Sequence, residues 1–116
     1  MPKKKDAEIE KDGEEMRPSA FTPDEAIRRI RLILRDGKTI RSDHLIKDMA
    51  SGRHGVSEQD LLHVLQTGEI ISSPEWDENQ RNWKYKVEGT DLEDEELRAI
   101  TIIIEERFSI FIVTAY

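Results

Sequence analysis

The sequence contains no cysteine and no apolar run long enough to cross a bilayer. Without cysteine there are no disulfides and no thiolate metal sites, and with no apolar signal segment a reducing location is favoured, so we expect a cytoplasmic protein. A membrane-spanning helix needs about 20 consecutive apolar residues, whereas Thr101, Ser109 and the charges between them interrupt the most apolar region. We therefore expect no membrane association.

Basic residues are also fewer than acidic residues. The 116 residues include 18 Lys and Arg against 25 Asp and Glu, which gives a formal net charge of −7. Nucleic-acid-binding proteins usually carry clustered basic residues, so this balance argues against a broad contact with phosphate backbones. Charge acts locally, however, and the acidic residues are concentrated between Asp91 and Glu96. This acidic run is suited to docking a basic partner.

Several motifs of common enzyme sites are missing. The chain has neither a glycine-rich phosphate loop nor a nucleophile elbow, so nucleotide hydrolysis and serine esterase chemistry have no support. Its three histidines, His44, His54 and His63, are not spaced as a pair of metal ligands on one helical face. We expect neither a bound metal nor a cofactor.

Residues 1–19 are predicted to form a charged, disordered tail, because they contain too few apolar side chains to offset the entropy of ordering. Residues 20–116 are predicted to form a single domain with a small hydrophobic core. Capping residues and glycine stops within it predict three helices, from Pro23 to Gly37, from Ser42 or Asp43 to Gly52, and from Ser57 to Gly68.

The first predicted helix carries an apolar stripe opposite a row of arginines. Ile27, Ile30 and Ile33 recur at helical spacing and are expected to face the core. Two interpretations of the opposite face remain open, since it could bind phosphate or be only a solvated surface. The arginines of this face are Arg28, Arg29, Arg31 and Arg35.

The rest of the chain has the pattern of strands. They are predicted over Glu69–Ser72, Arg81–Val87, Leu97–Ile104 and Phe108–Tyr116, with a polar turn from Pro74 to Gln80. The last two are rich in Ile, Phe and Val, which predicts central strands covered on both faces, and their short connection predicts an antiparallel hairpin. Together the pattern predicts an α+β domain with helices on one face of an antiparallel sheet of about four strands.

The polar residues left over could perform metal-free RNA cleavage, in which a base takes the 2′-hydroxyl proton, an acid protonates the leaving oxygen and cations stabilise the phosphorane. His44 is the natural proton carrier, because an imidazole exchanges its proton near neutral pH. Alternatively, His44 only contacts the backbone at a helix start. The other candidates are Lys47, Arg81, Lys84, Lys86, Tyr85, Thr114 and Tyr116.

The order of motifs resembles a known family. The stretches are "IRLILRDGKTIRSDHLIKDM", "GVSEQDLLHVLQTGEII", "WKYKV" and "IFIVTAY". They resemble the domain of unknown function family four-two-five-eight over Ile27 to Tyr116. That family is distantly similar to the RelE, BrnT and MqsR toxins, which are small α+β ribonucleases, and its members often accompany zinc-finger antitoxins. The resemblance implies a RelE-like fold, RNA as substrate and such an antitoxin as protein partner.

The resemblance also implies roles for individual residues. His44 matches the family histidine, and the chain departs from the pattern at Asp48, where the family commonly has arginine, with Arg53 as the nearest replacement. On the ribonuclease hypothesis, His44, Lys47 and Tyr116 are catalytic. Arg53, Arg81, Lys84, Tyr85 and Thr114 then bind the substrate.

A competing hypothesis is a non-catalytic module of the same fold that binds a protein through its sheet edge or acidic loop. The two hypotheses predict different geometries. Convergence of His44, Lys84 and Tyr116 in one cleft favours the ribonuclease, and their separation favours the module. The sequence predicts no oligomeric state.

Overall fold

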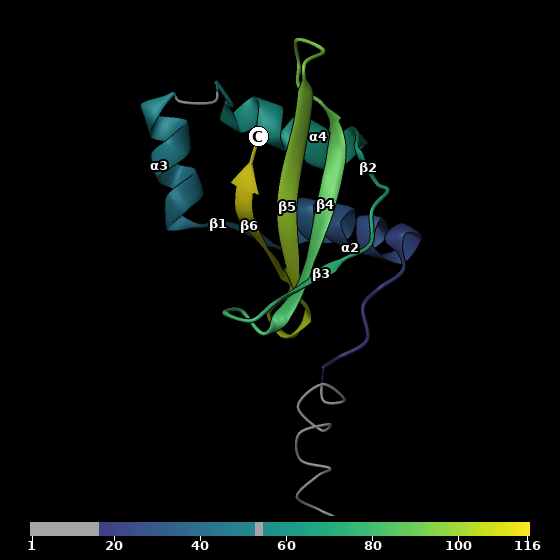
Figure 1. Cartoon of the computed structure of the whole chain (residues 1–116). Helices are drawn as coiled ribbons and strands as arrows, with labels where there is room; N and C mark the ends of the chain where they lie inside the picture. Colours follow the sequence, from purple (N-terminus) through teal and green to yellow (C-terminus); the bar gives the residue numbers. More distant parts are fainter. Residues whose placement is uncertain (1–16, 53–54) are drawn as a thin grey trace, which may run out of the picture.

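A computed structural model describes residues 17–52 and 55–116, and in it three α-helices accompany a six-stranded mixed sheet (Figure 1). The helices are α2 (Pro23–Asp36), α3 (Asp43–Ser51) and α4 (Glu58–Thr67). The strands are β1 (Lys38–Arg41), β2 (Glu69–Ile70), β3 (Glu75–Asp77), β4 (Asn82–Thr90), β5 (Glu96–Ile104) and β6 (Ser109–Ala115), and a 3-10 turn, η1 (Glu105–Arg107), joins the last two. The predicted α+β class is confirmed.

Each helix begins at a side-chain cap, as the sequence predicts. The hydroxyl of Thr22 accepts a hydrogen bond from the Glu25 amide, and that of Ser42 accepts one from the Leu45 amide. In α4, Ser57 and Asp60 exchange both bonds of a capping box. Because these bonds satisfy backbone donors locally, the three helix starts can be read from the sequence.

The sheet differs from the prediction in strand number and direction. Its strands lie in the order β1-β6-β5-β4-β2, with β3 also paired to β4. The prediction of about four antiparallel strands was wrong, because β1 joins the sheet and runs parallel to β6. The predicted β5–β6 hairpin is confirmed.

The two unpredicted strands, β1 and β3, are short and depend on partners elsewhere. The four residues of β1 lie between two helices and pair with a strand that starts about 70 residues later. In β3, Trp76 lies opposite Trp83 of β4, with the ring centroids 5.2 Å apart in an edge-to-face arrangement. Long-range pairing and one aromatic contact therefore override a local pattern that is typical of turns.

In the described part of the chain, helices cover one face of the sheet. Buried residues of α2 and α4 lie against the side of β4 and β5 that carries Tyr85, Val87 and Ala99 (Figure 1). The opposite side carries Lys86, Ile100 and Thr114, which are neighbours in register across three strands and only half-buried. We call this side the open face. The prediction that the last two strands are covered on both faces holds only in part: on this side Ile102, which pairs with Lys84, is 1% exposed, whereas Ile100 and Thr114 are half-buried and α3 lies beside β6.

Residues 1–16 of the predicted tail lie outside the described residues. Arg17 to Ser19, also predicted as tail, run along the β3–β4 hairpin, where the carbonyl of Pro18 accepts a hydrogen bond of 2.6 Å from the Trp83 indole. Arg17 lies over the ring of Trp76, 4.8 Å from its centroid. Within the described part of the chain, no helix combines the length and apolar character needed to cross a membrane.

Asp60 joins the start of α4 to the loop between β4 and β5. Its carboxylate accepts hydrogen bonds from the Leu92 amide and from the hydroxyl and amide of Ser57. These bonds, the Leu92 bond first, lower the pKa of Asp60. A lowered pKa in the folded state means that the ionised carboxylate stabilises the fold above the unfolded pKa of about 4, and that this contribution is lost as the pH falls through the folded pKa.

We predict that Asp60→Asn lowers the free energy of unfolding at neutral pH by about 1 kcal/mol, the usual cost of losing a helix cap. The difference from the wild type should be smaller at a pH of about 3, because the unfolded carboxyl takes up its proton below its pKa of about 4 and the folded carboxyl only at lower pH. Urea unfolding at both pH values measures it. Glu106→Gln, which removes an exposed charge from η1, is the control and should change little. An equal loss at both pH values would contradict the electrostatic account.

Candidate nucleic-acid interface

The open face contains a groove of about 310 Å³. Strands β4, β5 and β6 form its floor, and the segment between β2 and β3 forms one wall. Its lining residues are Ser72, Ser73, Glu75, Lys84, Lys86, Ile100, Val113, Thr114 and Tyr116. The floor is thus partly apolar, and two lysines, several hydroxyls and the carboxylate of Glu75 surround it.

Lys84 and Lys86 share the groove because side chains two residues apart in a strand point to the same face. The ammonium of Lys84 lies 3.8 Å from a carboxylate oxygen of Asp77, and its side chain is 29% exposed. Lys86 forms no ion pair with any residue of the described ranges. The groove therefore holds one partly neutralised cation and one available cation.

Tyr116 closes one end of the groove with an aromatic ring. Its backbone exchanges two hydrogen bonds with Arg98, of 2.9 and 2.7 Å, which extends the sheet pairing to this residue. The guanidinium of Arg98 lies 5.4 Å from the ring centroid. The residue is nevertheless 45% exposed. The ring is held by its backbone and by Arg98, yet part of it meets solvent.

Helix α3 begins beside the groove. The hydroxyl of Ser42 donates a 2.6 Å hydrogen bond to the carbonyl of Val113, a lining residue, and its amide donates a 3.0 Å bond to Ile112. His44 follows two residues later. These bonds fix the first turn of α3 against the end of β6.

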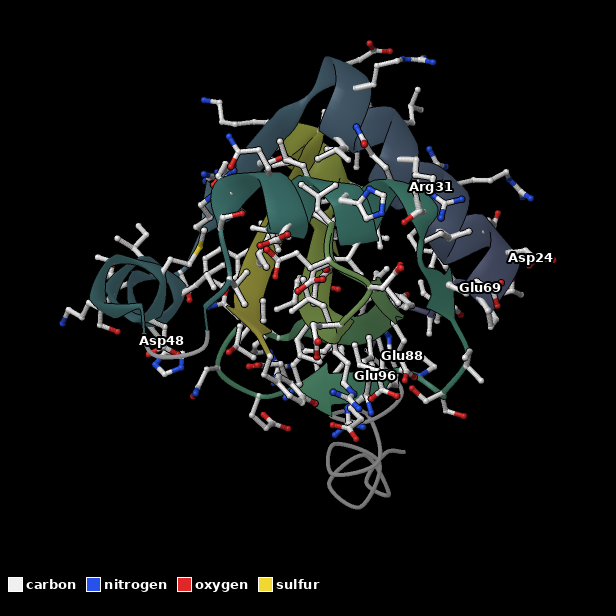
Figure 2. All side chains as sticks on the ribbon, turned by 90° about the horizontal axis from the view of Figure 1, so that it is seen from above. Asp24, Arg31, Asp48, Glu69, Glu88 and Glu96 are labelled. Carbon is white, nitrogen blue, oxygen red and sulfur yellow. The ribbon has the colours of Figure 1, made fainter. Side chains whose placement is uncertain are left out.

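His44 forms an ion-pair contact with Asp48, one turn further along α3. The distance from Nε2 of His44 to a carboxylate oxygen of Asp48 is 3.2 Å, with the histidine side chain 64% exposed and the aspartate side chain 11% exposed. Figure 2 shows Asp48 on the side of α3 that faces away from the α2–α4 layer. The carboxylate thus orients the imidazole within reach of solvent.

The predicted site residues do not all come together. Lys84, Thr114 and Tyr116 line one groove, whereas His44 and Lys47 lie on α3 and are absent from its lining. Arg81 lies at the β3–β4 turn, 3.5 Å from a carboxylate oxygen of Glu78 and 5.7 Å from the Trp76 ring centroid. The predicted residue Arg53 lies outside the described residues.

Tyr85 lies on the opposite face from the groove floor. It is 2% exposed, and its hydroxyl accepts a hydrogen bond of 2.8 Å from the Phe21 amide. Burial raises its pKa, which keeps the hydroxyl protonated. In this position the residue ties the chain before α2 to the sheet.

Three polar residues of the groove, Ser72, Ser73 and Glu75, were not among the candidates, and Lys86 was a candidate to which no role was assigned. The alternation of "WKYKV" contained the signal for Lys86, since it assigns Lys84 and Lys86 to one face and Tyr85 to the other. No local sequence pattern predicts that the two serines belong to the groove. They reach it through the pairing of β2 and β3 with β4. Among the residues described, no three His, Cys, Asp or Glu side chains are grouped so that they could hold a metal ion.

The model of the domain of unknown function family DUF4258 matches residues 41–116. The chain belongs to this family. Neither a curated protein nor a solved structure matches the chain. The DUF4258 match contains the groove, α3 and α4, whereas α2 and most of β1 precede it.

We predict that Tyr85→Phe lowers the free energy of unfolding by about 1 kcal/mol, because the Phe21 amide then loses its partner. Tyr116→Phe removes a hydroxyl from a partly exposed ring and is the matched control, with little expected change. Urea unfolding measures both. Equal losses in the two variants would contradict the structural role of the Tyr85 hydroxyl.

We also predict that a fragment of residues 41–116, the part matched by the family, does not fold cooperatively. It lacks α2, whose Ala26, Ile30 and Ile33 are fully buried. Burial of each isoleucine is worth about 1.5–3 kcal/mol, a large part of the stability of a small domain. Circular dichroism during heating should show a sharp transition for residues 17–116 and none for 41–116. A sharp transition for the shorter fragment would contradict the prediction.

Proposed function

We propose that this protein is a metal-independent RNA endonuclease of a toxin–antitoxin type system, and that RNA lies across the open face. The observation that carries the proposal is the groove, which gathers Lys84, Lys86, Thr114 and Tyr116 on an uncovered sheet surface. Cations, hydroxyls and an aromatic ring are the groups that recognise single-stranded RNA. Formal net charge does not oppose this role, because the acidic β4–β5 loop is not part of the groove lining.

The two lysines bind the RNA backbone in this proposal. Their Cα atoms lie about 7 Å apart along β4, since a strand rises about 3.3 Å per residue. Lys86 is the stronger phosphate ligand, because Asp77 neutralises part of the charge of Lys84. Thr114, which lies in the same cross-strand row as Lys86, donates its hydroxyl to a phosphate or ribose oxygen.

Tyr116 stacks on a base. A partly exposed ring whose backbone is hydrogen-bonded on both sides loses little freedom when a base covers it. Base stacking on aromatic side chains is worth about 1–3 kcal/mol and tolerates any sequence. The ring thus selects unpaired RNA rather than a particular base.

In this proposal His44 is the group that transfers a proton during RNA cleavage. The hydrogen bond between the Ser42 hydroxyl and the Val113 carbonyl supports this role, because it holds the first turn of α3 at the edge of the groove. In the reaction, a base removes the 2′-hydroxyl proton, the 2′ oxygen forms a bond to phosphorus, the bond to the 5′ oxygen breaks, and that oxygen takes up a proton. Lys47 and the groove lysines stabilise the negative charge of the phosphorane.

Membership of DUF4258, together with the resemblance to the RelE, BrnT and MqsR toxins carried by the motif order, supports the toxin assignment. On this proposal the fold is RelE-like, the protein acts on RNA in the cytoplasm, and a zinc-finger antitoxin is its protein partner. Such a partner would silence the enzyme by covering the open face.

A second candidate is a non-catalytic binding module of the same fold. The observation that favours it is the position of His44, which is absent from the groove lining and pairs with Asp48. In a module of this kind the groove would bind an extended segment of a protein partner instead of RNA.

The experiment is cleavage of a mixed cellular RNA pool in the presence of a metal chelator, with the purified protein freed of any partner. We expect the wild type to cut, His44→Ala to lose at least about 100-fold in rate, and Lys86→Ala to lose less, in line with the usual contribution of a proton-transfer group. His63→Gln, a change on α4 at the covered face, is the matched control.

The outcomes separate the two candidates. Cleavage by the wild type and by His63→Gln, but not by His44→Ala, supports the ribonuclease. Equal cleavage by the wild type and His44→Ala would remove His44 from the mechanism. If neither protein cuts, the binding module is the better account.

A further inference from the structure

The exposed side of α2 is the most basic helix surface that the structure describes. A shallow hollow of about 600 Å³ lies along it, lined by Glu25, Arg28, Arg29, Arg31, Leu32 and Arg35. Leu32 lies among the arginines and is 36% exposed. We call this surface the arginine face. It precedes the part of the chain that DUF4258 matches.

Two of these arginines have internal roles. The guanidinium of Arg31 donates hydrogen bonds to the carbonyls of Leu65 and Gly68 at the end of α4, and Figure 2 shows it reaching toward that helix. Arg29 lies 3.6 Å from a carboxylate oxygen of Glu105. The other two point away from the fold.

Arg28 and Arg35 are exposed and lie about 10 Å apart along the helix, on either side of Leu32. Among the described residues, Arg35 forms its ion pair with its neighbour Asp36, at 2.8 Å. Arg28 forms no ion pair within the described residues. Like charges three or four residues apart destabilise a helix. The spacing of Arg28, Arg31 and Arg35 therefore lowers the stability of α2 when no partner is bound. A partner that neutralises them would remove this cost.

The complement of the arginine face lies in the same sequence, in the β4–β5 loop. Leu92 is 59% exposed there, and Glu93, Asp94 and Glu95 follow it. None of these three acidic residues forms an ion pair with a described residue. Both surfaces thus combine one exposed leucine with exposed charges, and the charges have opposite signs.

The acidic loop is already ordered for binding. The carboxylate of Asp91 accepts hydrogen bonds from the amides of Glu93 and Glu95, and Asp60 accepts one from the Leu92 amide. The amide of Asp91 donates to the carbonyl of Glu95. A loop held in this way loses little conformational entropy on docking.

The loop cannot reach the arginine face of its own chain. The bond between Leu92 and Asp60 fixes it at the start of α4, and Figure 1 shows it protruding beyond α4, while α2 crosses the back of the sheet further down. Contact between the two surfaces therefore requires two molecules.

We propose that the arginine face binds the β4–β5 loop of a second copy of this chain. In a two-fold dimer each loop docks on the α2 helix of the other copy, so the same contact forms twice. Leu92 covers Leu32, and Glu93 and Glu95 pair with Arg28 and Arg35. Because these ion pairs lie at the surface, added salt weakens the dimer. The open face takes no part in this contact.

The test is a charge exchange followed by analytical ultracentrifugation of the full chain. One variant carries Arg28→Glu and Arg35→Glu, and the other carries Glu93→Arg and Glu95→Arg. Each variant alone places like charges together in both contacts, which should raise the dimer dissociation constant at least roughly 100-fold. Their equimolar mixture restores opposite charges in both contacts and should form a heterodimer.

The matched control carries Lys38→Glu and Arg107→Glu, which reverse two exposed charges that belong neither to the arginine face nor to the β4–β5 loop, and should leave the dimer intact. Circular dichroism confirms that each variant folds. A wild type that remains monomeric at high concentration and low salt would overturn the proposal, as would reversed variants that still dimerise or a mixture that does not. If the wild type is monomeric and the arginine reversals weaken RNA binding, the arginine face contacts nucleic acid instead.

Discussion

The parallel pairing of β1 with β6 is the contact on which the rest of the structure depends. It brings residues 38–41 beside the end of the chain, so the segment between the two strands must form the rest of the sheet and the remaining helices. Ser42 follows directly and bonds to the carbonyl of Val113 and, through its amide, to Ile112. The short strand β1 therefore forms one edge of the sheet and fixes the position at which α3 begins.

A consequence of this topology is a sheet with two unlike faces. Helices α2 and α4 bury one face with Ile30, Ile33, Leu61 and Leu65, while α3 is held at the side by its bonds to β6. The other face keeps Lys84 and Lys86 in contact with solvent. Because α3 begins at the edge of that face, Ser42 at the start of this helix is hydrogen-bonded to Val113 of the groove lining although the two come from distant parts of the sequence.

The sequence predicts those features that local bonds determine. Thr22, Ser42 and Ser57 mark the helix starts, because each cap satisfies backbone donors within its own turn. It does not predict β1, whose partner β6 lies far along the chain, or β3, whose three residues pair with β4 within a segment that has the local pattern of a polar turn. The separation of Tyr85 from Lys84 could have been foreseen, because adjacent residues in a strand point to opposite faces.

The candidate site was predictable to a similar degree. Lys84, Thr114 and Tyr116, which were predicted to belong to the site, line one groove because strand alternation and the pairing of the last strands bring them to one face. The relation of His44 to them could not be predicted, because it depends on how α3 packs against β6. The same holds for Ser72 and Ser73, which enter the groove only through the pairing of β2 and β3.

Charge is segregated over this acidic molecule rather than spread evenly. The open face holds the groove lysines, α2 holds the exposed arginines, and the loop beyond Thr90 holds a dense acidic run. A protein with a formal net charge of −7 can therefore present separate surfaces to a polyanion and to an acidic peptide, since exposed charges more than about 10 Å apart are largely screened from one another.

The central claim is that RNA lies on the open face. Ultraviolet cross-linking of a short single-stranded RNA to the wild-type protein, followed by mass spectrometry of the cross-linked peptides, tests it most directly. The account predicts cross-links in the peptides that contain Tyr116 and the segment from Lys84 to Lys86. Cross-links confined to α2 and α4, or none at all, would contradict it.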